Sequence, residues 1–257
     1  MQSGAVAVAV VLPFSLKQSP GWLVSQYAQA LGSYPYATVN TANFYYPLGG
    51  NWNKIENAAP LAANLLLAAG CLGYGAAWTL RFRKENQKRM WIEQALIVLF
   101  AAWFILCAVI SASWTMTGTA AMAFAFLIVL SLYIRKGDIH FLPYLGALLF
   151  ILLYVFGIKM HERYIFPALF LLGLAWVIHR DPRILTVLLA ITAAEFLNEG
   201  IVLDNSIRLG SSQGHLNNDT VILADIISVI NVAAAIYAVR LGIVLGSREP
   251  GQPRYVR

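Results

Sequence analysis

Seven apolar runs, each close to the length needed to cross a bilayer, restrict what this sequence can fold into. A spanning helix needs about 20 mostly apolar residues. Only 12% of the 257 residues are charged, whereas soluble domains carry roughly 25%. The sequence therefore predicts an all-α, polytopic membrane helical bundle. The predicted spans are residues 58–80, 92–112, 117–134, 141–158, 165–178, 184–203 and 221–245.

A shorter apolar run at residues 5–16 precedes these spans. No Lys or Arg comes before it, so it is a poor signal peptide. Two interpretations remain open. The run is a short eighth helix, or it completes a helix that begins upstream, in which case the chain is the C-terminal part of a larger or split protein. We predict one domain of seven or eight transmembrane helices at residues 1–246, followed by a basic cytoplasmic tail at 247–257.

The distribution of basic residues predicts the topology. When segment 81–89 is placed in the cytoplasm, most Lys and Arg residues fall on the inner side, as is usual for membrane proteins. The net charge of +6 therefore does not imply a nucleic-acid partner. Cys71 and Cys107 lie inside apolar runs, without metal-ligand or disulfide spacing. Three polar segments then face outside, namely residues 15–57, 159–164 and 204–219.

The most unusual of these segments places four ionisable side chains in the five positions 159–163, between two apolar runs. Ionisable groups beside hydrocarbon usually mark a substrate, ion or proton site. Lys159 and Arg163 suit a phosphate, and Glu162 could orient Arg163 or accept a proton. If the helix continues outward, these three side chains share one face. The alternative is a set of side chains that snorkel from a helix end.

A second segment, residues 34–52, carries no charge and is rich in aromatic residues and Asn. Aromatic faces beside amide donors and acceptors suit a sugar. Asn40 and Asn43 would share a face if this piece were helical. The alternative is an amphipathic loop at the level of the lipid head groups.

Two polar stripes lie within the last two spans. The first consists of Thr192, Glu195, Asn198 and Glu199, with Asp204 continuing the polarity outward. Carboxylates at this depth should face a protein-lined or watery cavity. The alternative is hydrogen bonding between helices, which we favour for Asp225 in the second stripe, formed by Asp225, Ser228 and Asn231.

Two blocks, Met160-His161-Glu162-Arg163-Tyr164 and Asn40-x-x-Asn43, resemble bacterial membrane proteins related to the GPI-anchor mannosyltransferase II. That family belongs to the GT-C superfamily of polytopic glycosyltransferases. Residues 33–43 and 159–168 carry the resemblance, and residues 195–198 carry it more weakly. It covers most of the chain and corresponds to the C-terminal half of a typical member. It implies a GT-C-like fold that takes a sugar from a polyprenyl-phosphate or dolichyl-phosphate carrier. The superfamily's acidic catalytic residue usually lies on the first outer loop, so we expect it outside this chain.

The resemblance implies a mannosyltransferase-like, inverting enzyme of the bacterial inner membrane, truncated or split, with its site facing outside. Its partners would be a lipid-linked sugar donor, a glycan, lipid or protein acceptor, and an N-terminal partner polypeptide. The resemblance implies no particular cofactor, and the chemistry is compatible with a divalent cation. The catalytic candidates are Glu162 and Asp204. The substrate-binding candidates are Lys159, His161, Arg163, Tyr164, Asn40, Asn43 and Tyr36.

Two other classes of function compete with this interpretation. A non-catalytic membrane subunit, or a degenerate homologue, would keep the basic site and bind a lipid-phosphate sugar without transferring it. A transporter would show internal repeats and helices broken near the middle of the membrane, and the sequence shows neither.

Overall fold

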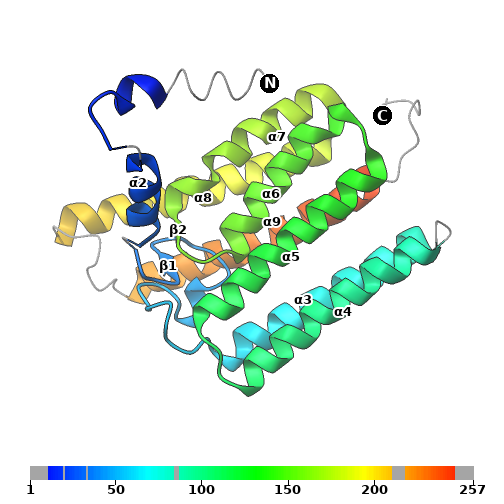
Figure 1. Cartoon of the computed structure of the whole chain (residues 1–257), viewed down its shortest axis with the longest axis horizontal. Helices are drawn as coiled ribbons and strands as arrows, with labels where there is room; N and C mark the ends of the chain where they lie inside the picture. The colour runs from blue at the N-terminus through cyan, green and yellow to red at the C-terminus, as the bar shows by residue number, and fades with distance from the viewer. Residues whose placement is uncertain (1–10, 20, 33, 84–86, 210–217, 247–257) are drawn as a thin grey trace. The chain divides into compact units, whose positions relative to one another are not determined.

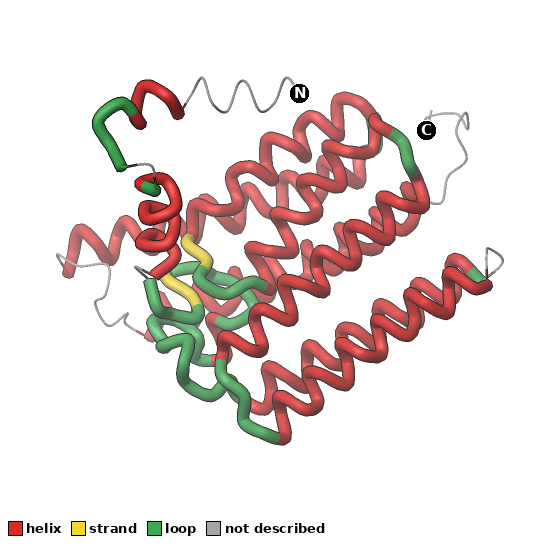
Figure 2. Tube along the Cα trace, in the orientation of Figure 1, coloured by secondary structure: helices red, strands yellow, loops and turns green. Residues whose placement is uncertain are grey.

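The computed structural model of the chain describes residues 11–19, 21–32, 34–83, 87–209 and 218–246, and most of them are helical (Figures 1 and 2). Seven helical segments of this described part are long and apolar enough to cross a membrane, which confirms the all-α polytopic bundle. The elements are α2 (Trp22–Gly32), β1 (Thr38–Val39), η1 (Tyr46–Leu48), α3 (Leu61–Phe82), α4 (Gln87–Val109), α5 (Trp114–Lys136), η2 (Ile139–Phe141), α6 (Leu142–Phe156), β2 (Met160–His161), η3 (Glu162–Ile165), α7 (Phe166–His179), α8 (Pro182–Leu209) and α9 (Asn218–Gly246).

Contacts divide the chain into two units, Met1–Pro35 and Tyr36–Arg257. The polar segment predicted at residues 15–57 is therefore split between them. In the first unit, the described residues form a helical turn at 11–15 and helix α2. The seven candidate spans and both strands belong to the second unit. The predicted tail at 247–257 and most of the apolar run at 5–16 lie outside the described residues.

The seven predicted spans coincide with helices, but the segment predicted as an outer loop at 204–219 is shorter than expected. Helix α8 continues through Asp204 to Leu209, and α9 already begins at Asn218. The added turns are stabilised locally, because Arg208 Nε donates to Asp204 Oδ1 over 2.8 Å and the Ser206 hydroxyl donates to the Val202 carbonyl. An i, i+4 pair of this kind favours continuation of a helix.

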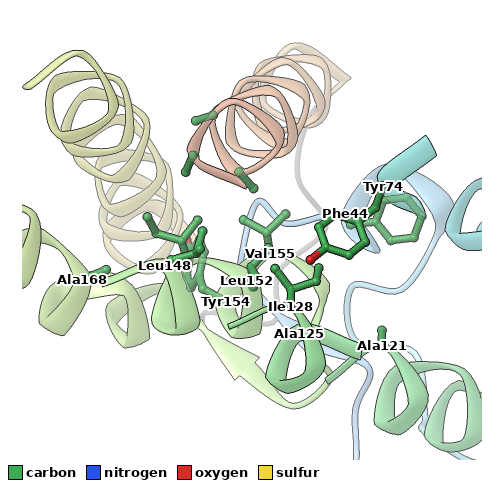
Figure 3. Close-up of a cluster of buried hydrophobic side chains, with 14 of the residues drawn as sticks. Phe44, Tyr74, Ala121, Ala125, Ile128, Leu148, Leu152, Tyr154, Val155 and Ala168 are labelled. Atoms are coloured by element: carbon green, nitrogen blue, oxygen red, sulfur yellow. The ribbon is translucent and has the colours of Figure 1, made fainter. Parts of the chain in front are cut away.

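The helices of the second unit pack mainly on their sequence neighbours, and α9 closes the bundle against α8, α6 and α5. In Figure 1 the hairpin of α3 and α4 lies alongside α5. The apolar core centres on α6, where Leu148, Leu152 and Val155 are buried. Figure 3 shows these side chains beside Ile128 of α5. Close packing of this kind, rather than exclusion from water, holds helices together within a bilayer.

Helix ends follow local sequence signals. The Ser113 hydroxyl accepts a hydrogen bond from the Met116 N–H at the start of α5, as an N-cap does. At its other end Gly137 adopts a left-handed φ of 59° after Arg135 and Lys136, whose charges suit the helix C-terminus. Helices α6 and α7 each have a proline in the first turn, where the missing N–H costs nothing.

A buried ion pair ties α3, α4 and α5 together. Glu93 of α4 accepts hydrogen bonds from Trp78 Nε1 over 2.7 Å, from Arg89 Nε over 3.2 Å and from the Arg135 guanidinium. The Arg135 guanidinium also stacks on the rings of Trp78 and Phe82, at 4.8 and 4.2 Å from their centroids. The side chains of Glu93 and Arg135 are only 9% and 4% exposed. A buried ion pair of this kind is stable only when each charged group keeps its partner and its hydrogen bonds.

The connection after α6 is packed directly on α5. A Cβ atom at Gly118 would lie 2.0 Å from the Ile158 side chain, so only glycine allows this approach. Small residues commonly permit such contacts in membrane bundles. The contact fixes the chain immediately before Lys159, the first residue of the predicted polar site.

Candidate functional site

The chain changes direction sharply between α6 and α7. Gly157 ends α6 in an extended conformation, and Lys159 has a left-handed φ of 58°. Residues Met160–His161 are then extended as β2, and Glu162–Ile165 form the 3-10 turn η3 before α7 begins. The helix does not continue outward through this segment, so Lys159, Glu162 and Arg163 do not share a helical face. Gly157 and the turn at Lys159 explain the difference.

This turn pairs with the uncharged segment near the start of the chain. Strands β1 and β2 are parallel, with Thr38 opposite Met160 and Val39 opposite His161. The Lys159 N–H donates to the Ala37 carbonyl over 2.9 Å, and the Thr41 hydroxyl donates to the Met160 carbonyl, 119 residues away, over 2.9 Å. The two segments that the sequence singled out therefore lie side by side.

Residues Asn43, Phe44 and Tyr45 cap the C-terminal end of α6. The last four carbonyls of a helix have no partner within it. Here the Leu153 carbonyl accepts from the Gly157 N–H, and the following three accept from residues 43–45. Asn43 Nδ2 donates to Tyr154 over 3.4 Å, the Phe44 N–H to Val155 over 3.0 Å, and the Tyr45 hydroxyl to Phe156 over 2.7 Å.

The cap assigns Asn43 a structural role. Its side chain is fully buried, its Nδ2 also lies 3.5 Å from the Gly157 carbonyl, and its Oδ1 accepts from the Tyr45 N–H. The segment is not helical, so Asn40 and Asn43 do not share a helical face. Asn43 was predicted to bind substrate, and these contacts engage its side chain in holding the loop against the end of α6.

We predict that Asn43→Ala lowers the free energy of unfolding by about 2 kcal/mol, because buried carbonyls of α6 lose their donor in a low-dielectric interior. Asn57→Ala is the matched control. Asn57 is an exposed asparagine of the same loop, and its replacement should change stability by less than about 0.5 kcal/mol. Denaturant titration of both variants in detergent micelles measures the difference. Equal stability of the two would contradict the capping role.

The loop backbone is also held from α8 and α9. Asn198 Oδ1 accepts from the Ala42 N–H over 3.3 Å, and Asn231 Nδ2 donates to the Ala42 carbonyl over 2.8 Å. Burial, and then the charge of Asp225 on α9, raise the pKa of Tyr46 to about 12, against a smaller opposing effect of the hydrogen bond between Tyr46 and Asn51. The Tyr46 phenol therefore stays protonated at physiological pH.

Asn40 and Tyr36 lie on an aromatic rim, half-buried rather than enclosed. Asn40 has a left-handed φ of 53°, its N–H donates to Asn51 Oδ1 over 2.8 Å, and its Oδ1 accepts from Trp52 Nε1 over 2.9 Å. The Tyr36 ring meets the Trp52 ring edge to face, with centroids 5.1 Å apart. The rim thus presents an aromatic edge and amide groups next to the β1–β2 pair.

The ionisable residues of β2 and η3 differ in accessibility. His161 is buried, with its ring centroid 5.3 Å from that of the exposed Tyr164. The Glu162 carboxylate lies between His161 Nδ1 at 3.8 Å and Arg163 Nη1 at 3.9 Å. Its side chain is 12% exposed, whereas that of Arg163 is 62% exposed. Arg163 therefore offers an accessible cation beside a shielded carboxylate.

The polar stripe of α8 turns its middle part toward this segment. Glu195 is buried, and the Tyr154 hydroxyl donates to its Oε2 over 3.0 Å. Glu195 interacts electrostatically with the carboxylates of Glu199 and Glu162. Glu199 interacts in the same way with Glu162 and with the oppositely charged Arg163. Among the described residues, Glu195 Oε1 and Asn198 Nδ2 have no hydrogen-bond partner. Nothing in the sequence indicated that the Tyr154 hydroxyl would bind Glu195, because Tyr154 lies within an apolar run.

Two residues of the first predicted polar stripe and its continuation, Thr192 and Asp204, are not grouped with this segment. Thr192 is exposed, and its hydroxyl donates to the Leu188 carbonyl of its own helix. Asp204 is half exposed on α8, where it is paired with Arg208. The structure thus groups Lys159, His161, Glu162, Arg163, Glu195 and Glu199 near the loop. In the part of the chain that the structure describes, no three His, Cys, Asp or Glu side chains form a metal-binding group.

Comparisons with models of protein families, with curated proteins and with solved structures found no match to this chain. The seven apolar helices and the site geometry by themselves define an integral membrane helical bundle with a polar site at the β1–β2 pair. The resemblance to the GT-C superfamily stays a prediction.

Proposed function

We propose that this protein binds a polyprenyl-phosphate-linked sugar and acts as a membrane glycosyltransferase of the mannosyltransferase type. One observation carries the proposal: the parallel pairing of Thr38–Val39 with Met160–His161 joins an uncharged, aromatic and amide-rich loop to a cationic segment. A sugar phosphate needs both surfaces, since aromatic faces and amides suit the sugar and Arg and Lys suit the phosphate.

The charges around Arg163 fit the departure of a lipid phosphate. In the proposed reaction a carboxylate removes the proton from an acceptor hydroxyl, and the hydroxyl oxygen attacks the anomeric carbon of the sugar. The bond between that carbon and the phosphate oxygen breaks, and the lipid phosphate leaves with the electron pair. Arg163 and Lys159 stabilise the charge that develops on the phosphate.

Glu162 is the preferred base among the two catalytic candidates. It lies between His161 and Arg163, at the segment that pairs with the loop. Asp204 is instead engaged in an exposed ion pair with Arg208. We further propose that the site opens on the outer face of the bacterial inner membrane, in line with the predicted excess of basic residues on the other side.

The proposal is tested with the purified full chain in phosphatidylcholine vesicles and polyprenyl-phosphate mannose labelled in the sugar. Saturable retention of the label, displaced by unlabelled polyprenyl phosphate but not by the neutral polyprenol, is expected. Equal displacement by the two would contradict phosphate recognition. Transfer of the label to an acceptor fraction identifies the enzyme, whereas retention without transfer favours a non-catalytic binding subunit.

A further inference from the structure

An apolar groove lies between α3, α5 and α9 and extends to Phe44 and Phe156 beside the loop that caps α6. Its volume is about 720 Å³, within the range of pockets that hold a ligand. Much of its lining comes from α3, between Leu66 and Ala77, and from α9, between Val232 and Val244. Eleven positions of a helix rise about 16 Å, so the groove follows the helices for roughly half of the hydrocarbon thickness.

Two glycines of α3 leave the groove open. Gly70 and Gly73 line it, and a Cβ atom at either position would meet no other atom within 4 Å. Neighbouring side chains therefore do not fill this space. Figure 3 shows Tyr74 of α3 reaching from the same helix toward Ile128 and Ala125 of α5, all three of which line the groove.

Polar atoms in this groove occur near one end. Arg240 lines the groove from within the α9 span, six residues before the helix ends at Gly246, which is about 9 Å along the axis. Among the described residues it forms no ion pair. An arginine at this depth reaches toward the interface or pairs with an anion.

Tyr74 supplies a second polar group at a similar depth. It lies eight residues before the end of α3 at Phe82, or about 12 Å along the axis. Its hydroxyl is buried without a hydrogen-bond partner among the described residues. Consecutive spans cross the membrane in opposite directions. Helix α3 is the first candidate span and α9 the seventh, so both end on the same side. The groove therefore combines an apolar channel with a cation and a hydroxyl at one level.

We propose that this groove binds an anionic phospholipid from the inner leaflet, with an acyl chain between α3 and α9. The phosphate lies at Arg240, and an ester oxygen accepts a hydrogen bond from Tyr74. Charge complementarity selects this occupant, because an anionic phospholipid brings a net negative charge to Arg240, whereas the choline of a zwitterionic lipid already offsets its own phosphate. The proposal is independent of the sugar-phosphate site.

Native mass spectrometry of the full chain in mild detergent tests the head group. The chain is incubated with phosphatidylglycerol or phosphatidylcholine of identical acyl chains. Retention of phosphatidylglycerol is expected to be about fivefold higher, as for one basic residue near an anionic head group. Arg240→Gln should remove this preference, and Arg240→Lys should keep most of it. No preference in the native chain, or an unchanged preference in Arg240→Gln, would overturn the proposal.

A second pair of variants tests the acyl-chain position. Gly70→Leu places a side chain in the groove and should lower retention of both lipids about tenfold. Gly173→Leu is the matched control, because Gly173 of α7 also has no atom within 4 Å of a Cβ position and lies outside the groove. Circular dichroism confirms that each variant is folded. Equal retention by the folded variants would place the lipid elsewhere, and if Gly70→Leu does not fold, the Arg240 variants decide.

Discussion

Replacement of Arg163 with alanine is expected to reduce sugar transfer about a hundredfold while leaving the protein folded. Preorganised groups that stabilise developing charge contribute factors of about 10²–10³ to a reaction rate. The Arg163 side chain is 62% exposed, and its contact with Glu162 spans 3.9 Å, so its loss removes little stability. The measurement is transfer of labelled mannose in vesicles, together with retention of polyprenyl phosphate, which should also weaken.

Arg208→Ala is the matched control for this prediction. Arg208 is also an exposed arginine with a carboxylate partner, 70% exposed and 2.8 Å from Asp204. Its replacement should leave transfer within about twofold of the native protein, since exposed pairs contribute little. Arg163→Lys should recover part of the activity, because lysine keeps the charge but not the bidentate geometry. Native transfer and binding in Arg163→Ala would exclude Arg163 from the site.

Replacement of Glu93 with glutamine is expected to cost about 3 kcal/mol of stability. Glutamine keeps the size of the side chain and can still accept from Trp78, but it leaves the Arg135 guanidinium, 4% exposed, without this carboxylate. Removing one partner of a buried ion pair typically costs about 3–5 kcal/mol. Unfolding in mixed detergent micelles, followed by tryptophan fluorescence, measures the change.

The double variant Glu93→Met with Arg135→Met separates charge pairing from packing. Replacing both members of a buried pair by apolar residues is often nearly neutral. We therefore expect the double variant to be more stable than Glu93→Gln by about 2 kcal/mol. A double variant that is less stable than the single one would show that hydrogen bonds and ring stacking, rather than charge compensation, hold α3, α4 and α5 together.

The sequence predicted the spans well and the ends of some helices less well. Run length and hydropathy are local properties, so all seven spans coincide with helices. Helix α8 extends through Asp204 with an i, i+4 pair and a serine hydrogen bond in its added turns. The polar residues of this segment favoured a loop in the sequence-based prediction. Asp204 was therefore expected on an outer loop and lies on a helix.

The candidate site was predicted in part. The sequence placed segments 34–52 and 159–164 on the same predicted outer side, and the strand pairing joins them. It could not assign Asn43 to the cap of α6, because the carbonyls that it contacts are more than a hundred residues away, at Tyr154 and Gly157. Nor did it indicate the Glu93–Arg135 pair, whose members lie 42 residues apart on different helices.

Composition and spacing alone determined that this chain forms a polytopic helical bundle. The length of an apolar run is a local property of the sequence and does not depend on which residues pack against it. Only the tertiary structure decided what each polar group binds. A helix carbonyl or a buried charge must be satisfied by whichever group the packing brings to it. In this protein that group comes from a distant part of the chain: from loop residues 43–45 for α6, and from Arg135 for Glu93.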